Sequence, residues 1–155
     1  MTVILADHDI ERHARLLFAA PQALEWAQLL NIRLASFSES GLVETSTDRE
    51  VWRQAQQLGM LLLTNNRNKE GPDSLEQTLR DELTLTSLPV LTISNADRFL
   101  ASRAYRERCA NRVARSPRIW SVFAASPGSS SPEPPGAAQH RWRHHVPPIC
   151  ATISL

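Results

Sequence analysis

Short apolar runs and longer segments of helical periodicity alternate along the first 115 residues of the chain. Residues 2–6 are apolar and rich in β-branched side chains, and residues 32–37 alternate between apolar and polar, so both segments predict strands. Residues 60–64 are apolar up to a final threonine, which indicates a strand buried on both faces. Residues 89–93 predict a fourth strand.

Apolar positions at helical spacing fill the segments between these strands. They predict helices within residues 10–30 and at 47–58, 75–83 and 95–114. The helix at 47–58 has the clearest boundaries, because Thr47 and Glu50 can form a capping box and Gly59 can take the left-handed conformation that ends a helix.

Strands that alternate with helices predict an α/β fold with a parallel sheet, right-handed crossovers and helices on both faces. We therefore expect residues 1–115 to form one three-layer domain with about four parallel strands. No apolar run approaches the roughly 18 residues of a membrane span, and the N-terminus lacks the pattern of a secretory signal. Two cysteines without metal or redox spacing complete a pattern that favours a cytoplasmic protein with no membrane partner.

The composition changes abruptly after Arg115. Residues 1–115 carry 14 Lys and Arg against 15 Asp and Glu, whereas the last forty residues carry three Arg, one Glu and seven of the ten prolines. The Ser-, Pro- and Gly-rich run at 126–136 buries too little apolar surface to offset its ordering entropy, so residues 116–155 predict a disordered tail. Translation in a shifted reading frame would explain the change equally well.

Two further interpretations of this tail stay open. Basic and aromatic residues interleave at 141–145, as they do in segments that bind nucleic acid. His140, His144 and His145 form a candidate metal site.

Polar residues follow every predicted strand, at the edge where open parallel sheets bind their ligands. They are Asp7 and Asp9, then Ser38 and Glu39, then Asn65, Asn66 and Asn68, and last Asn95 and Asp97, with Asp48 at the start of the helix that follows the second strand. Converging carboxylates repel one another unless a cation neutralises them, and Mg²⁺ or Mn²⁺ prefers such oxygen ligands. Each of these residues is also an ordinary turn or cap residue, so a structural role stays open.

Three segments resemble the PIN-like family of small bacterial proteins: Val-Ile-Leu-Ala-Asp at 3–7, Thr-Ser-Thr-Asp-Arg-Glu-Val at 45–51, and Gln-Leu-Gly-Met-Leu-Leu-Leu-Thr-Asn-Asn at 57–66. The order of predicted elements matches the family over residues 1 to about 113. The resemblance implies a PIN-type fold and a ribonuclease that depends on Mg²⁺ or Mn²⁺, often a toxin beside an antitoxin. By position, Asp7 and Asp48 match acidic residues of the family and are the predicted catalytic residues and metal ligands. Asp9 or Asn66 would complete the metal shell.

The loop after the third strand departs from the family pattern. Members usually place one or two aspartates after the threonine, whereas this chain has Thr-Asn-Asn-Arg-Asn at 64–68. An amide oxygen can ligate Mg²⁺ but supplies no negative charge, and Arg67 adds a positive charge.

Two functions therefore stay open. One is a metal-dependent endoribonuclease with RNA, an antitoxin protein and a second copy of the chain as candidate partners. The other is a non-catalytic PIN-like module that binds RNA or a protein. A Rossmann-type cofactor protein is disfavoured because no glycine-rich loop follows the first strand.

Overall fold

The computed structural model describes residues 2–20, 25, 27–28, 31–65, 71–116, 119 and 152–155. Its centre is a parallel sheet with the strand order β2-β1-β3-β4-β5. The strands are β1 (Thr2–Ala6), β2 (Ile32–Ala35), β3 (Leu61–Thr64), β4 (Val90–Thr92) and β5 (Thr152–Ser154).

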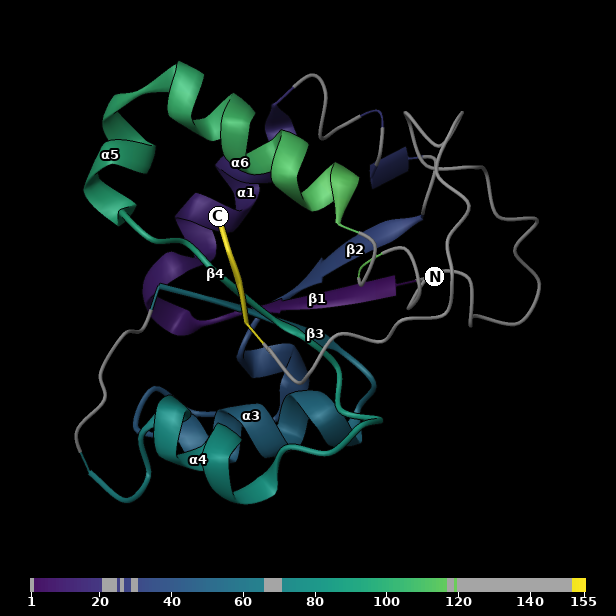
Figure 1. Cartoon of the computed structure of the whole chain (residues 1–155), viewed down its shortest axis with the longest axis vertical. Helices are drawn as coiled ribbons and strands as arrows, with labels where there is room; N and C mark the ends of the chain where they lie inside the picture. Colours follow the sequence, from purple (N-terminus) through teal and green to yellow (C-terminus); the bar gives the residue numbers. More distant parts are fainter. Residues whose placement is uncertain are drawn as a thin grey trace.

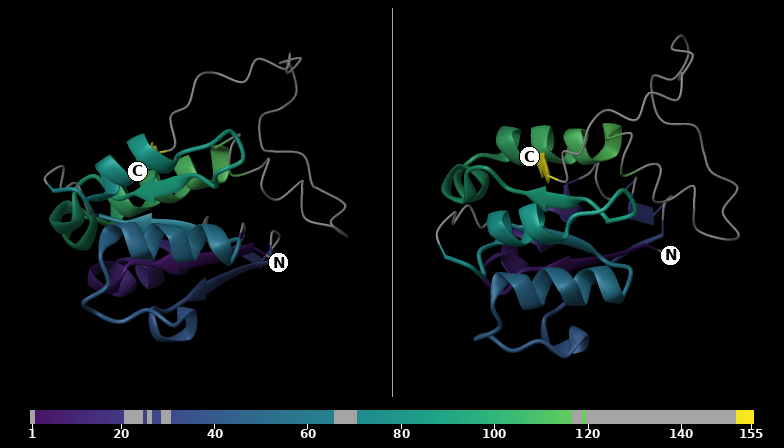
Figure 2. Two further views of the ribbon diagram at one scale, coloured as in Figure 1. Left: turned by 90° about the horizontal axis from the view of Figure 1, so that it is seen from below. Right: turned by 60° about the horizontal axis from the view of Figure 1, so that its bottom comes forward.

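Helices cover both faces of this sheet. They are α1 (Glu11–Ala19), α3 (Asp48–Gln57), α4 (Leu75–Glu82), α5 (Ala96–Ala101) and α6 (Arg103–Arg115), with short 3₁₀ turns η1 (His8–Ile10) and η2 (Ser38–Ser40). Figure 1 shows α1, α5 and α6 on one side of the sheet and α3 and α4 on the other. The right-hand view of Figure 2 brings the α3 and α4 layer forward, with α6 on the far side of the sheet. The predicted α/β fold with parallel strands flanked by helices is therefore confirmed.

Two hydrophobic cores follow from the alternation of side chains along the strands. Ile4 and Ala6 of β1 pack on the face that α1, α5 and α6 cover, together with Leu61 and Leu63 of β3. Leu5 of β1 and Leu62 of β3 pack on the opposite face, against Val51, Trp52 and Ala55 of α3 and Leu75 of α4. Because all of these strand residues are buried, β1 and β3 are the central strands that an uninterrupted apolar run predicts.

The boundaries of α3 are those that the sequence predicts. Thr47 accepts a hydrogen bond from the backbone of Glu50, whose carboxylate accepts from the Thr47 amide at 2.8 Å. Gly59 ends the helix with a φ of 65°, where a side chain would be strained.

The predicted single helix at 95–114 is wrong, because the chain forms two helices that meet at Ser102. This residue has extended backbone angles, φ −123° and ψ 112°. Its hydroxyl accepts from the Tyr105 amide and so caps α6. Serine competes for backbone hydrogen bonds in this way, which favours a cap over the interior of a helix.

The fifth strand, β5, is an element that the sequence does not predict. It pairs with β4, and the Leu155 amide donates to the Thr92 carbonyl at 2.8 Å. Leu155 is 2% exposed and Ile119 is 1% exposed, so both contribute to the core beneath α6. The rest of the predicted tail, including its histidines and the basic cluster at 141–145, lies outside the described residues.

Within the described part of the chain, no helix is both long enough and apolar enough to cross a membrane.

The burial of Leu155 predicts that β5 contributes to stability. Leu155→Ala should lower the free energy of unfolding by about 2–3 kcal/mol, since it leaves a cavity against the sheet. The matched control is Leu85→Ala, because Leu85 is 85% exposed and its truncation should change stability by less than about 0.5 kcal/mol. Urea unfolding followed by circular dichroism measures both, and equal effects would mean that β5 does not pack on this core.

Candidate functional site

The strand order creates one point where the sheet reverses its direction of winding. From β1 the chain moves to β2 on one side and then returns past β1 to β3 on the other. In open parallel sheets with this order, ligands bind at the carboxyl ends of the two strands that flank the reversal. Here those strands are β1 and β3, which end at Ala6 and Thr64. Asp7 follows directly.

Asp7 and Thr64 meet across this reversal point. The Asp7 amide donates to the Leu63 carbonyl at 2.9 Å, which extends the pairing of β1 with β3 by one residue. The Thr64 hydroxyl donates to Asp7 Oδ2 at 2.7 Å, and the His8 amide donates to Oδ1 at 2.8 Å. Thr64 is 1% exposed. The carboxylate of Asp7 is therefore held in one orientation by a buried side chain and by the backbone.

Burial raises the pKa of Asp7 above its ordinary value of 3.8. The hydrogen bonds from Thr64 and His8 act in the opposite direction, because they favour the ionised form. The negative charges of Asp48 and Asp9 raise the pKa further. Asp48 thus lies close enough to Asp7 for its charge to act on it, although the two residues are 41 positions apart in the sequence.

Asp48 occupies the first turn of α3 and also fixes the start of α4. Its Oδ2 accepts a hydrogen bond from the Leu75 amide at 3.1 Å, while Thr47 is the N-cap of α3 itself. Two helix N-termini, each with a partial positive charge, therefore face this carboxylate. Asp48 therefore has a structural role, as the sequence allowed. It connects the starts of α3 and α4 and is not the N-cap of α3.

Arg49 joins the same two helices from the neighbouring position. Its guanidinium donates to the Pro72 carbonyl at 2.6 Å and forms ion pairs with three carboxylates. These are Asp73 at 3.0 Å, Asp81 at 2.9 Å and Glu82. Arg53 also forms an ion pair with Glu82, at 2.7 Å. Hydrogen bonds from Arg53 and Arg49 lower the pKa of Glu82. This network holds α4 against α3 and so keeps the Leu75 amide at Asp48.

The structure describes only some of the other predicted site residues. Asp9 is exposed in η1, and its charge acts on Asp7. Asn66 and Arg67 lie outside the described residues. Among the residues that are described, no group of three or more His, Cys, Asp or Glu side chains is placed to hold a metal ion. Of the predicted site residues, Asp48 and Asp9 both act on Asp7 through their charge. Thr64, which the sequence marks only as the last residue of an apolar run, is a hydrogen-bond partner of Asp7 that the sequence did not predict.

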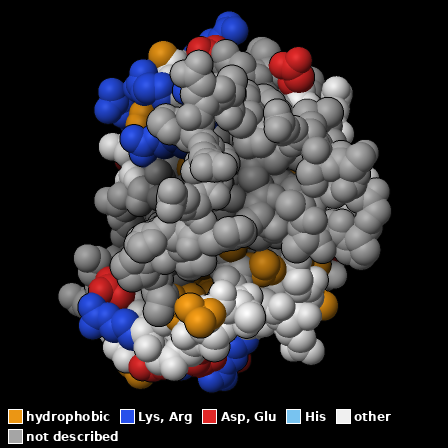
Figure 3. Space-filling model, turned by 45° about the vertical axis from the view of Figure 1, so that its right-hand side comes forward, with side chains coloured by type: hydrophobic (Ala, Val, Ile, Leu, Met, Phe, Trp, Pro, Cys, Tyr) orange, Lys and Arg blue, Asp and Glu red, His pale blue; other side chains and the backbone are white. Residues whose placement is uncertain are grey.

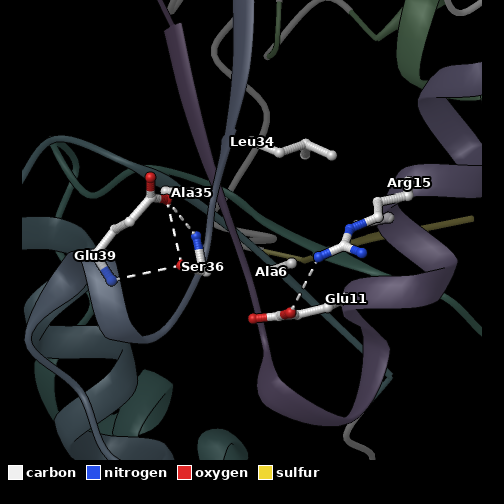
Figure 4. Close-up of a pocket in the computed structure, with 8 residues that line it drawn as sticks. Ala6, Glu11, Arg15, Leu34, Ala35, Ser36 and Glu39 are labelled. Atoms are coloured by element: carbon white, nitrogen blue, oxygen red, sulfur yellow. Dashed lines mark hydrogen bonds and ion pairs between the residues drawn. The ribbon is translucent and has the colours of Figure 1, made fainter.

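A pocket of about 250 Å³ opens between α1 and the carboxyl end of β2. Its floor is small and apolar, and its rim is charged; the lining residues are Ala6, Ala14, Leu34, Ala35, Glu11, Arg15, Ser36 and Glu39. Figure 4 shows Glu11 and Arg15 of α1 facing Ser36 and Glu39 across the opening. Glu39 accepts from the Ser36 amide at 2.8 Å, and this bond lowers the pKa of the carboxyl group.

This pocket is separate from the Asp7 carboxylate. Ala6 lines the pocket and packs on the α1 side of the sheet. Leu62 packs on the α3 side, and Thr64, two residues further along β3, shares that side. Asp7 bonds to Thr64, so its carboxylate is directed toward α3 and Asp48.

Comparison of the chain with protein-family models, curated proteins and solved structures found no match in any of the three.

The raised pKa of Asp7 predicts a pH-dependent effect of Asp7→Asn on the metal-free protein. The raised pKa means that ionisation of Asp7 costs stability as the pH rises from below 3.8 through the folded-state pKa. Asparagine carries no charge, so the variant should be more stable than the original chain at about pH 7, and this gain should vanish below about pH 3.8. Urea unfolding across this pH range in the presence of a chelator measures it. A variant less stable at pH 7 would show that the hydrogen bonds outweigh burial.

Proposed function

We propose that the chain is a PIN-like, metal-dependent endoribonuclease whose site is the Asp7–Asp48 pair. The observation that carries the proposal is the position of Asp7: a partly buried carboxylate at the reversal point of a parallel sheet, oriented by Thr64 and within reach of a second carboxylate's charge. Carboxylates with perturbed pKa values that lie at such ligand-binding edges are candidates for functional sites.

The donor set suits a hard divalent cation. Burial and neighbouring negative charge make ionised Asp7 unfavourable, and a cation between the carboxylates would remove that cost. Asp7 and Asp48 would hold Mg²⁺ or Mn²⁺, with Asp9 or Asn66 as a further ligand. When bound, such a cation would supply Lewis-acid stabilisation of the charge that develops on a phosphodiester during attack by water.

The residues of the chain have separable roles in this proposal. Thr64 and the His8 amide orient Asp7, and each of the two carboxylate oxygens already accepts one hydrogen bond. Asp48 is held by the Leu75 amide. Because the carboxylate oxygens are shared in this way and the described residues hold no group of three metal-ligating side chains, the affinity for metal is expected to be weak.

The second candidate is a PIN-like module that binds RNA or a protein without cleaving it. The observation that favours it is the lack of a group of three metal-ligating side chains among the described residues. In this case Asp7 and Asp48 would serve only the structural roles that their hydrogen bonds show. A toxin role beside an antitoxin, and self-association, stay predictions from the family resemblance.

Removal of either carboxylate should weaken metal binding and stop cleavage. Asp48→Asn keeps an oxygen that can accept from the Leu75 amide, so it removes the charge and spares the helix junction. We expect Asp7→Asn and Asp48→Asn each to weaken Mn²⁺ binding at least tenfold by calorimetry and to stop Mn²⁺-dependent cleavage of single-stranded RNA.

The matched control is Asp97→Asn, since Asp97 is an exposed aspartate in the first turn of α5. Cleavage that survives both Asp7→Asn and Asp48→Asn would reject this site. Absence of cleavage by the original chain, together with unchanged RNA binding, would favour the non-catalytic module.

Substitution of Thr64 tests whether the orientation of the Asp7 carboxylate matters, without changing its charge. Thr64→Val keeps the side-chain shape but removes the hydroxyl that donates to Asp7 at 2.7 Å. Loss of a group that orients a metal ligand typically weakens metal binding by roughly 10–100-fold. Thr92→Val is the control, because Thr92 is a buried threonine at the end of the adjacent strand β4 and is 5% exposed. Equal Mn²⁺ affinities for the two variants would argue against metal binding at Asp7.

A further inference from the structure

Positive charge is concentrated in α5 and α6. Residues 96–115 carry six arginines and two acidic residues, a net charge of +4. The described residues from 2 to 95 carry six arginines and twelve acidic residues, a net charge of −6. Figure 3 shows blue side chains gathered at the top of the molecule, the end that carries α1, α5 and α6. The molecule therefore has a basic layer on an otherwise acidic body.

Four exposed arginines of this segment define a surface that we name the arginine face. Its members are Arg98 on α5 and Arg108, Arg112 and Arg115 on α6. The buried side of α6 consists of Cys109, Ala110, Val113 and Ala114. Positions 108, 112 and 115 recur at helical spacing on the opposite side and extend over about 10 Å of the helix axis.

An aromatic ring lies within this face. The guanidinium carbons of Arg98 and Arg108 are 5.1 Å and 5.6 Å from the centre of the Tyr105 ring. Tyr105 is anchored from the other side, because its hydroxyl donates to the Leu155 carbonyl at 3.2 Å and its ring lies edge-on to Phe99. Two guanidinium groups are thereby held near one ring, and neither is ion-paired among the described residues. An anion would relieve their mutual repulsion.

The arginine face begins at the same edge of the sheet as Asp7. The helix α5 starts at Ala96, four residues after the end of β4 at Thr92. The carboxyl ends of parallel strands share one edge, so α5 leaves the edge at which β1 ends and Asp7 lies. The Asp7 carboxylate faces α3 and α5 lies on the other face of the sheet, so a polymer bound at Asp7 would cross the carboxyl edge to reach Arg98 and α6.

We infer that the arginine face binds the backbone of single-stranded RNA that extends from the site at Asp7. This inference rests on the proposed ribonuclease function for the identity of the polyanion. All positive residues of the segment are arginines and none is lysine. The whole chain has a single lysine, Lys69, so this is not a choice specific to the segment; even so, a guanidinium binds phosphate through two parallel hydrogen bonds and stacks on aromatic groups, which suits a nucleic-acid strand.

The test measures binding separately from cleavage. All proteins carry Asp7→Asn and are kept in a chelator, so that no RNA is cut. Fluorescence anisotropy with a labelled single-stranded RNA of about 12 nucleotides gives the affinity at several salt concentrations. The face variant is Arg98→Gln with Arg108→Gln. The matched control is Arg33→Gln with Arg80→Gln, which removes the same charge from exposed arginines on β2 and α4.

Loss of two phosphate contacts should reduce the slope of log affinity against log salt by about 1.4 and weaken binding roughly 20-fold at about 0.1 M salt. The control should change neither the slope nor the affinity beyond about twofold. Thermal unfolding checks that both variants are folded.

Equal affinities and salt slopes for the face variant and the control would overturn the inference. Tighter binding of an acidic peptide such as polyglutamate than of the RNA would overturn it in favour of a protein partner. RNA binding that depends on the arginine face, in a chain that never cleaves RNA with Mn²⁺, would support the inference and reject the proposed catalytic function.

Discussion

The parallel pairing of β1 with β2 on one side and β3 on the other is the constraint from which the rest of the architecture follows. A chain that leaves β1 in one direction and returns past it in the other must place its crossover helices on opposite faces if both crossovers have the same hand. That requirement accounts for α1 on one face and α3 on the other. It also makes β1 and β3 the two strands that flank the reversal, and Asp7 directly follows β1.

The chemistry of this edge is a balance between burial and hydrogen bonding. Burial makes the negative charge of Asp7 unfavourable, while Thr64 and the His8 amide hold the carboxylate in place. Asp48 adds a second charge nearby, and the Leu75 amide and Arg49 network position it through α4. A charge that is costly yet rigidly oriented is preorganised for a cation, because binding relieves the cost without moving the ligand. The structural role of Asp48 is thus compatible with the catalytic role that we propose for it.

Charge segregation gives the two helix layers different properties. Asp81 and Glu82 of α4 form ion pairs with Arg49 and Arg53 of α3, and these ion pairs hold the two helices together. In α6, Arg103 pairs with Glu107 of the same helix at 2.9 Å. The excess arginines contribute little to the stability of the fold, since like charges on one surface repel. This surplus of positive charge is the observation on which the inferred RNA-binding surface rests.

The sequence by itself determined the local elements. Apolar periodicity located four strands, and Thr47, Glu50 and Gly59 specified both ends of α3, because these signals act over a few residues. It also placed Asp7 and Asp48 at the edge where parallel sheets bind ligands, while leaving their roles open. Tertiary structure alone decided the contact of Thr64 with Asp7, the bond from Asp48 to the start of α4, and the pairing of β5 with β4. Each joins segments between 27 and 62 residues apart, and no local periodicity or cap encodes which distant strand edge or helix end a side chain will meet.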